Sequence, residues 1–532
     1  MERKSKSFVQ GAAILAVAGL IVKIIGALFR IPLANDVGSI GMSYYEVAYP
    51  YYAWLLVISS AGLPTAISKM VSERVTLGDY RGANKVFRTA LILLCGIGVV
   101  TSLLMFFGAD ALASISTFDK ASLSFKALAP ALLFVSIMCA FRGYLQGMQL
   151  MMGTAISQIV EQVGKLAIGY TLAIKMLPMG PEYAAMGALI GVTISEVLAL
   201  IVIILFYASQ KRRSFGRQRA AVELQRDSGP VLKAIILMAV PITIGASISP
   251  LTGIVDSALI GSTLLNLGFT QENAQIAYSL LRTNVTTLVN MPGVLTMALA
   301  MSLVPAISAS ITRKDYSGAK TVSRLGLKLA LVIGLPCAAG MFVLASQILS
   351  LLYPNLSITE LQLATELLRT ASIGVIFLSL VQSMTGVIQG MGRPNVPVFN
   401  LFIGFVLKVI TMLVLMNIPS INIQGAAVST VVCYAFAGIA DTIYTIRKSG
   451  MQIKIFDVFL KPLLSALVMG GAVKLCYDMF ARDGHSNSAT LISIIVGMAI
   501  YITLVLVLKM FSDDELGLIP GGKKIKKLLG RK

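Results

Sequence analysis

Several basic side chains lie inside long apolar segments, where an ion needs a partner or a polar cavity. Lys23 and Arg30 are seven residues apart, so a helix through them would present both on nearly the same face. Arg282 and Lys408 are cations in two other apolar segments. An ionised side chain at the centre of a bilayer costs at least about 2.5–3.5 kcal/mol. Cations placed there favour a cavity for an anionic substrate, with phosphate groups as the obvious candidates.

A second group of polar residues forms a stripe along one apolar segment. Its members are spaced i, i+3, i+4 and i+7, which places them on one helix face: Gln158, Glu161, Gln162 and Lys165. Glu161 and Lys165 could neutralise each other as an i,i+4 pair, which would be a structural role. Alternatively, Lys165 joins the other cations in lining the cavity. The stripe by itself leaves both interpretations open.

The remaining chemistry that the residue types allow is narrow. Asp256 could hold a coupling monovalent cation, or it could be a hydrogen-bonded structural acid. His485 is the single histidine, and the five cysteines show no CxxC or other metal-ligand spacing. The nucleotide-binding pattern GxxxxGK[ST] is also absent. We therefore expect no catalytic residues, no metal site and no cofactor beyond that possible ion, and hence no enzyme.

The composition indicates that the elements holding these charges lie in a membrane. Apolar residues make up 56% of the 532 residues and charged residues 13%. Soluble proteins carry about 25% charged residues. The net charge of +20 would suggest a nucleic-acid partner in a soluble protein. Here it fits the excess of Lys and Arg in cytoplasmic loops, so we expect no nucleic-acid binding.

Fourteen apolar segments are long enough to cross the bilayer as helices of about 20 residues. They begin near residues 8, 44, 86, 123, 154, 184, 232, 274, 326, 367, 396, 422, 458 and 489. Lys and Arg concentrate at both termini and in every second connection. The opposite connections hold only Lys120, Lys175 and Arg482. The sequence thus predicts an all-α polytopic membrane protein with both termini in the cytoplasm.

Two sequence blocks recur in the same order. One block carries four residues that reappear at a constant offset: Gly143, Gln146, Gly147 and Met148 recur as Gly386, Gln389, Gly390 and Met391. The same offset carries Lys165 onto Lys408. Earlier, GDYRGANKVFR matches KDYSGAKTVSR. Each copy holds six helices, so both copies insert in the same sense, with a substrate path expected between the two lobes.

This repeat predicts five parts. The N-lobe, with the first six helices, covers 1–208, and a basic cytoplasmic linker covers 209–231. The C-lobe, with the next six helices, covers 232–446. Two extra helices follow in 447–510, and a basic cytoplasmic tail covers 511–532.

Three stretches of the chain resemble a known family. GLPTAISKMVSERVTLGDY, RGYLQGMQLMMGTAISQIVEQVGK and DDELGLIP are similar to the bacterial MurJ and stage V sporulation protein B group. That group belongs to the multidrug/oligosaccharidyl-lipid/polysaccharide exporter superfamily. The resemblance covers almost the whole chain and implies fourteen helices in two lobes plus a terminal pair. It also implies flipping of lipid II, the undecaprenyl-diphosphate cell-wall precursor, from the inner to the outer leaflet of the bacterial cytoplasmic membrane. Roles in peptidoglycan synthesis, cell shape or sporulation would follow.

The family's basic cavity positions carry over in part. In the first helix they fall on Lys23, with lysine in place of arginine, and near Arg30, displaced by about one residue. The family's basic residue just before a proline of the eighth helix is replaced by threonine, since Thr286 and Thr287 precede Pro292. The expected diphosphate site combines Lys23 and Arg30 with three cations chosen for their place inside apolar segments, Lys165, Arg282 and Lys408.

The leading hypothesis is a flippase that works by alternating access, and we expect it to act as a monomer surrounded by membrane lipids. Two alternatives stay open: a drug/cation antiporter of the same superfamily, and a flippase for another lipid-linked polysaccharide unit. A membrane glycosyltransferase would need a carboxylate pair or metal site, and no DxD-type cluster occurs outside the tail.

Overall fold

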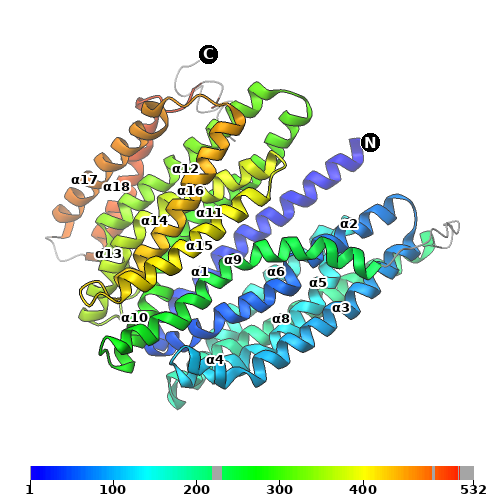
Figure 1. Cartoon of the computed structure of the whole chain (residues 1–532), viewed down its shortest axis with the longest axis horizontal. Helices are drawn as coiled ribbons and strands as arrows, with labels where there is room; N and C mark the ends of the chain where they lie inside the picture. Colours follow the sequence, from blue (N-terminus) through cyan, green and yellow to red (C-terminus); the bar gives the residue numbers. More distant parts are fainter. Residues whose placement is uncertain (1, 219–230, 482–485, 513–514, 516–532) are drawn as a thin grey trace. The chain divides into compact units, whose positions relative to one another are not determined.

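A computed structural model describes residues 2–218, 231–481, 486–512 and 515. Every regular element within these ranges is a helix, which confirms the predicted all-α architecture (Figure 1). The chain divides into two compact units, residues 1–279 and 280–532, which we call the first and second unit. The boundary falls inside the continuous helical stretch Gln271–Thr312.

In its described residues the first unit contains ten α-helices and three short segments. They are α1 (Glu2–Ser60), α2 (Leu63–Thr76), α3 (Tyr80–Phe107), α4 (Ala109–Ile115), η1 (Asp119–Ala121), α5 (Ser122–Gly147), α6 (Met151–Gly164), η2 (Lys165–Gly169), α7 (Tyr170–Met176), η3 (Leu177–Met179), α8 (Pro181–Gln218), α9 (Val231–Asn266) and α10 (Gln271–Ser279).

The described part of the second unit contains eight α-helices and two π-helical segments. They are η4 (Leu280–Val285), α11 (Thr286–Thr312), α12 (Tyr316–Val343), α13 (Ala345–Leu352), α14 (Ile358–Gly390), α15 (Asn395–Met416), α16 (Gln424–Ser449), η5 (Phe456–Leu460), α17 (Lys461–Phe480) and α18 (Ser486–Val507).

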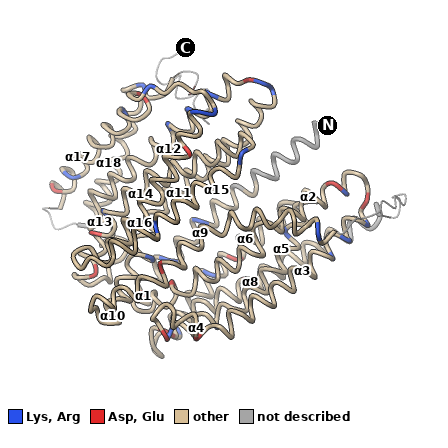
Figure 2. Tube along the Cα trace, viewed as in Figure 1, with Lys and Arg blue, Asp and Glu red and all other residues tan. Residues whose placement is uncertain are grey.

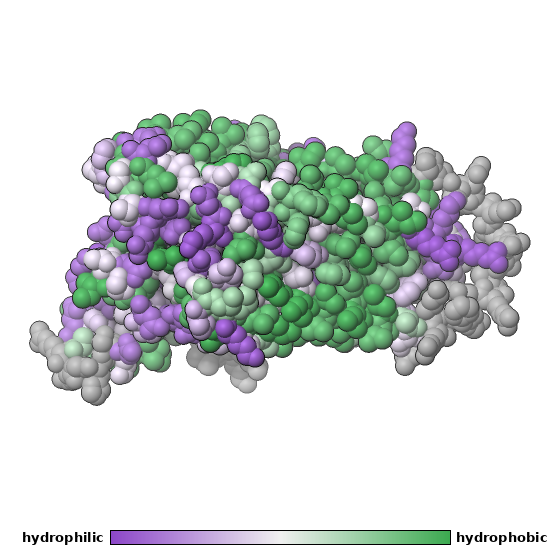
Figure 3. Space-filling view, turned by 90° about the horizontal axis from the view of Figure 1, so that it is seen from below, coloured by the Kyte–Doolittle hydropathy of each residue, from purple (hydrophilic) through white to green (hydrophobic). Residues whose placement is uncertain are grey.

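Twelve of the described helical stretches are long and apolar enough to cross a membrane. Figure 3 shows the corresponding hydrophobic band, with hydrophilic residues on either side of it. In Figure 2, long stretches of helix carry no charge. One of the twelve, Val17–Thr76, has 60 residues and is broken at Gly38, so it is long enough for two crossings. The predicted segment near residue 154 is α6, η2 and α7, a helical run with a π-helical interruption. The total of fourteen stays a prediction.

The repeated blocks make matching contacts inside each unit. A Cβ added to Gly147 would meet Val71, so α5 and α2 approach closely there. A Cβ added to Gly390 would meet Ile307, so α14 and α11 do the same. Gly147 and Gly390 are repeat partners, and Val71 and Ile307 are related by the offset of the other block. The duplication seen in the sequence is therefore also a duplication of helix packing.

The N-caps of α3 and α12 are duplicated as well. The Asp79 carboxylate accepts a hydrogen bond from the Gly82 N–H at 2.7 Å, and Asp315 accepts one from Gly318 at 2.8 Å. We expect Asp79→Ala and Asp315→Ala each to lower the free energy of unfolding by about 1 kcal/mol, because each leaves a helix N-terminus uncapped. Thermal unfolding of the purified variants checks this. Equal losses would agree with equivalent caps, and no loss in either would contradict the assignment.

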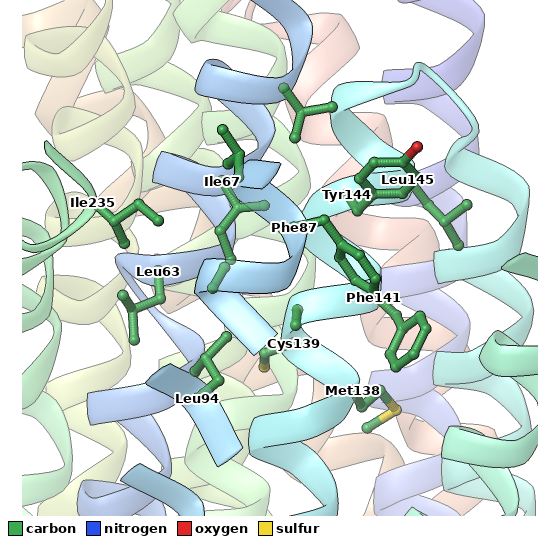
Figure 4. Close-up of a cluster of buried hydrophobic side chains, with 14 of the residues drawn as sticks. Leu63, Ile67, Phe87, Leu94, Met138, Cys139, Phe141, Tyr144, Leu145 and Ile235 are labelled. Atoms are coloured by element: carbon green, nitrogen blue, oxygen red, sulfur yellow. The ribbon is translucent and has the colours of Figure 1, made fainter. Parts of the chain in front are cut away.

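An aromatic cluster fixes the end of α5 in the first unit. The Phe87 ring lies 5.1 Å from Phe141, 4.9 Å from Tyr144 and 5.2 Å from Tyr207, measured between centroids. Figure 4 shows Phe87, Phe141 and Tyr144 within the surrounding apolar cluster. Edge and tilted ring contacts of this kind add to the burial of apolar area. These contacts fix the position of the part of α5 that carries Arg142.

In the second unit, the helices that follow the repeat pack on its core. α17 packs against α18 and α12, and Met469, Val473 and Tyr501 join the apolar cluster. After α18 the chain returns to α12, where Lys328 binds the Glu515 carboxylate at 2.7 Å with both side chains buried. Residues 219–230 of the expected linker, and 513–514 and 516–532 of the expected tail, lie outside the described residues, as do Arg482 and His485.

Candidate functional site

The kink in α1 brings together two charges that are far apart along the chain. Arg30 and Glu46 form an ion pair, although sixteen residues of straight helix would separate them by about 24 Å. Gly38 interrupts the helix with φ 73 and ψ 171, a backbone conformation that glycine adopts without strain. Because the chain bends there, Glu46 reaches Arg30. The Glu46 side chain is 1% exposed and that of Arg30 is 27% exposed. Solvent can therefore reach the arginine of the pair but not the glutamate.

Lys165 is the centre of a second group of charges. Its Nζ lies 2.7 Å from Glu161 Oε1 and 3.0 Å from Glu196 Oε1. The predicted i,i+4 pair of Glu161 and Lys165 is therefore confirmed. Glu196, on α8, is a partner that the stripe on its own could not identify. Lys165 thus joins α6 and η2 to α8 through two charged hydrogen bonds.

Arg142 of α5 completes this group. Its guanidinium lies 3.1 Å from Glu161 Oε2 and donates a further bond of 3.1 Å to the Ser157 hydroxyl. The Gln162 amide donates to Glu161 Oε1 at 3.2 Å, and Gln158 of the same stripe is half-buried. We call Arg142, Glu161, Lys165 and Glu196 the charged network. With all four ionised, two positive and two negative charges balance, so the network itself adds no net positive charge.

Glycines allow the helices of the charged network to approach. A Cβ added to Gly191 of α8 would meet the backbone of Gly169 in η2, and one added to Gly164 would meet Ser195 at 2.7 Å from its hydroxyl. Glu196 follows Ser195 directly. Because the backbones of α8 and η2 are in close contact, Glu196 lies within bonding distance of Lys165. The π-helical turn of η2 starts at Lys165, and such turns are frequent at functional sites.

Tyrosines of α1 border the charged network. The rings of Tyr45 and Tyr49 stack with centroids 5.6 Å apart, and Tyr49 lies 5.8 Å from Tyr52. Tyr52 is 1% exposed, and its hydroxyl has no hydrogen-bond partner among the described residues. It lies close enough to Glu196 and Lys165 to act on both electrostatically.

The other predicted site residues stand on other elements than those of the charged network. Lys23 of α1 is exposed, and among the described residues no ion-pair partner is found for it. Asp256 of α9 is buried at 4% exposure in the first unit. Arg282 lies in the π-helical segment η4, and Lys408, on α15, is 2% exposed; both belong to the second unit. The repeat partners Lys165 and Lys408 are thus both buried, each in its own unit.

Three charged residues of this site were not among the predicted site residues: Glu46, Arg142 and Glu196. For Glu46, the repeat contains a signal. The offset that relates Asp79 to Asp315 also relates Glu46 to Arg282, a predicted site residue. The carboxylates of the charged network are not repeated, because Gly404 and Ile439 stand at the positions equivalent to Glu161 and Glu196.

Two family descriptions match the chain. The one described as polysaccharide biosynthesis protein matches residues 8–311. The one described as MatE matches residues 283–414.

Relatives from Bacillus subtilis match nearly end to end. An uncharacterized membrane protein, YabM, is 27% identical over 98% of this chain and 97% of its own length. Stage V sporulation protein B is 25% identical over 97% of this chain and 98% of its own. The lipid II flippase MurJ is 26% identical over 94% of this chain and 95% of its own.

Solved structures share the fold. The lipid II flippase MurJ in an inward closed conformation gives a TM-score of 0.68 at 15% identity, covering 92% of this chain and 98% of that one. An inward-facing multidrug transporter of the MATE family gives 0.67 at 14% identity, covering 82% and 98%. The fold is therefore that of the MurJ and MATE transporters, and the chain is a multi-pass membrane protein.

Proposed function

Because the chain belongs to the polysaccharide biosynthesis protein family, we propose that it is a flippase that moves lipid II from the inner to the outer leaflet of the bacterial cytoplasmic membrane. The observation that carries this proposal is the end-to-end similarity to a lipid II flippase, MurJ, which covers 94% of the chain. A local match would indicate a shared domain, whereas this one includes both repeats and the helices after them.

The physical task of such a flippase is to carry an anionic diphosphate across an apolar layer. Cations inside the helices lower the cost of that charge. The residues we propose for diphosphate binding are Lys23, Arg30, Lys165, Arg282 and Lys408. Arg30 and Lys165 already hold carboxylates. The diphosphate would therefore compete with Glu46, Glu161 or Glu196 for them, whereas the exposed Lys23 offers its ammonium directly.

Further parts of the proposal concern energy and setting. A membrane potential that is negative inside assists export of anionic charge by about 2.3 kcal/mol per charge per 100 mV. Asp256 is the proposed site of a coupling monovalent ion. We propose that the protein acts as a monomeric, non-enzymatic transporter among membrane lipids, with both termini in the cytoplasm.

One observation favours a second candidate, a drug/cation antiporter. The MatE description matches residues 283–414, and a MATE transporter shares the fold. The similarity to stage V sporulation protein B, in turn, leaves room for a related lipid-linked saccharide as substrate.

Transport by the purified protein in liposomes distinguishes these three functions. Appearance of lipid II in the opposite leaflet supports the proposal, whereas transport of an organic cation without lipid II flipping would replace it. Flipping restricted to another undecaprenyl-linked saccharide would change the substrate.

Lys23 offers a test that is separate from folding. Since it is exposed and has no ion-pair partner in the described part of the chain, Lys23→Gln should change the free energy of unfolding by less than about 0.5 kcal/mol. We expect it nevertheless to lower the rate of lipid II flipping about tenfold, since a charge-assisted bond to the diphosphate is lost. Lys175→Gln, which neutralises another exposed lysine, is the matched control. Equal flipping by both variants would remove Lys23 from the substrate path.

A further inference from the structure

Among the described residues, two buried oxygen atoms at the edge of the charged network have no hydrogen-bond partner. Glu196 is 1% exposed, and its Oε2 has no hydrogen-bond partner among the described residues, although Oε1 binds Lys165. The Tyr52 hydroxyl is the other such atom, and it acts electrostatically on Glu196. A buried polar atom without a partner costs about 1–3 kcal/mol, and more when it carries charge. An unpartnered oxygen is therefore less costly on a neutral carboxyl than on a carboxylate.

Glu196 also decides the charge of its surroundings. With Glu196 ionised, Arg142 and Lys165 are balanced by Glu161 and Glu196. With a proton on Glu196 Oε2, the same network carries one net positive charge. Glu161 is less suited to take the proton, because Arg142, Lys165 and Gln162 all bind its oxygens.

The groups that face Glu196 come from every element packed on this part of α8. They are Tyr52 of α1, Arg142 and Cys139 of α5, Glu161 of α6 and Lys165 of η2. In α7, which also packs on α8, the Tyr170 hydroxyl donates to Asp36 at 2.5 Å and Lys175 is exposed.

We propose that Glu196 is a proton-binding site coupled to the anionic substrate. When the diphosphate approaches Lys165, a proton from water binds Glu196 Oε2, the Glu196–Lys165 bond weakens, and Lys165 becomes available to the diphosphate. When the diphosphate leaves, the proton returns to water and Lys165 binds Glu196 again. No other bond forms or breaks. This inference rests on the proposed function, since it assumes that the substrate anion reaches the charged network.

Linkage gives the direction of the effect. An anion near Glu196 favours its protonated state, and by reciprocity protonation strengthens binding of the anion. For one proton, the apparent affinity for lipid II should rise as pH falls, by up to about tenfold per pH unit.

The test uses the full-length protein in liposomes, with equal pH on both sides, varied over about three units. Wild-type protein should bind and flip lipid II more readily at the acid end. Glu196→Gln, which mimics the neutral carboxyl, should behave across the range as wild type does at its acid end. A Glu196→Gln variant that keeps the wild-type pH dependence would overturn the proposal. Flipping that depends on sodium but not on pH would also overturn it, by pointing to a metal cation at this site. Wild-type protein that flips no lipid II at any pH would instead reject the proposed function.

A carboxylate outside the charged network provides the control. Asp110 in α4 is 71% exposed and accepts a bond of 2.9 Å from Lys126. This hydrogen bond holds the pKa of Asp110 below its ordinary value. Asp110→Asn should leave the rate and its pH dependence unchanged.

A second measurement needs no variant. Binding of lipid II to the wild-type protein, followed by calorimetry in two buffers of different ionisation enthalpy, reports the protons taken up. Uptake of up to one proton per bound lipid supports the proposal, and no uptake throughout the range overturns it. This result stands even where Glu196→Gln fails to fold.

Discussion

Lys165→Met should lower the free energy of unfolding by about 3–5 kcal/mol and abolish flipping. The substitution keeps the length of the side chain but removes the cation that lies 2.7 Å from Glu161 and 3.0 Å from Glu196. Glu161 retains Arg142, whereas Glu196 would be left without the cation that binds it. Breaking a buried ion pair from one side has a cost of this size, because the remaining charge is buried without compensation.

The double variant separates stability from function. Lys165→Met combined with Glu196→Gln removes both charges, so much of the lost stability should return. Flipping should stay absent, because the ammonium proposed to meet the diphosphate is missing. Thermal unfolding in detergent and lipid II flipping in liposomes measure the two effects. A Lys165→Met variant as stable as wild type would show that Glu196 does not depend on this pair. Normal flipping by either variant would remove Lys165 from the mechanism.

Gly191→Val should be the most damaging change away from the charges themselves. Any Cβ at this position meets the backbone of Gly169, which cannot rotate aside as a side chain could. Overpacking usually lowers the free energy of unfolding by about 1–3 kcal/mol. A clash with backbone should cost at least as much as the upper value, because backbone cannot move aside easily. Because α8 must move away from η2, Glu196 is drawn away from Lys165. We therefore expect loss of flipping together with a marked fall in the unfolding temperature.

Gly96→Ala is the matched control for this variant. A Cβ added to Gly96, in α3, meets nothing within 4 Å. Alanine is favoured over glycine in a helix by about 1 kcal/mol, so this variant should be as stable as wild type or slightly more so. If Gly191→Val unfolds at the same temperature as Gly96→Ala, the close contact between α8 and η2 is not required.

The sequence alone was enough to predict the helical membrane fold and the duplication. Apolar segments of about 20 residues, and repeated residues at constant offsets such as Gly147 and Gly390, are properties of the chain that need no coordinates. The i,i+4 pair of Glu161 and Lys165 was also predictable, because helix geometry places such residues side by side. The placement of the diphosphate site stays a prediction.

Only the tertiary structure decided which charges become partners. Arg30 meets Glu46 because α1 bends at Gly38, and Lys165 meets Glu196 because α8 contacts η2 through Gly191 and Gly169. Helical periodicity relates residues three or four apart, so it cannot reveal partners sixteen or thirty-one positions away. Those contacts depend on how closely two backbones approach, and that distance is set by the packing of the whole unit.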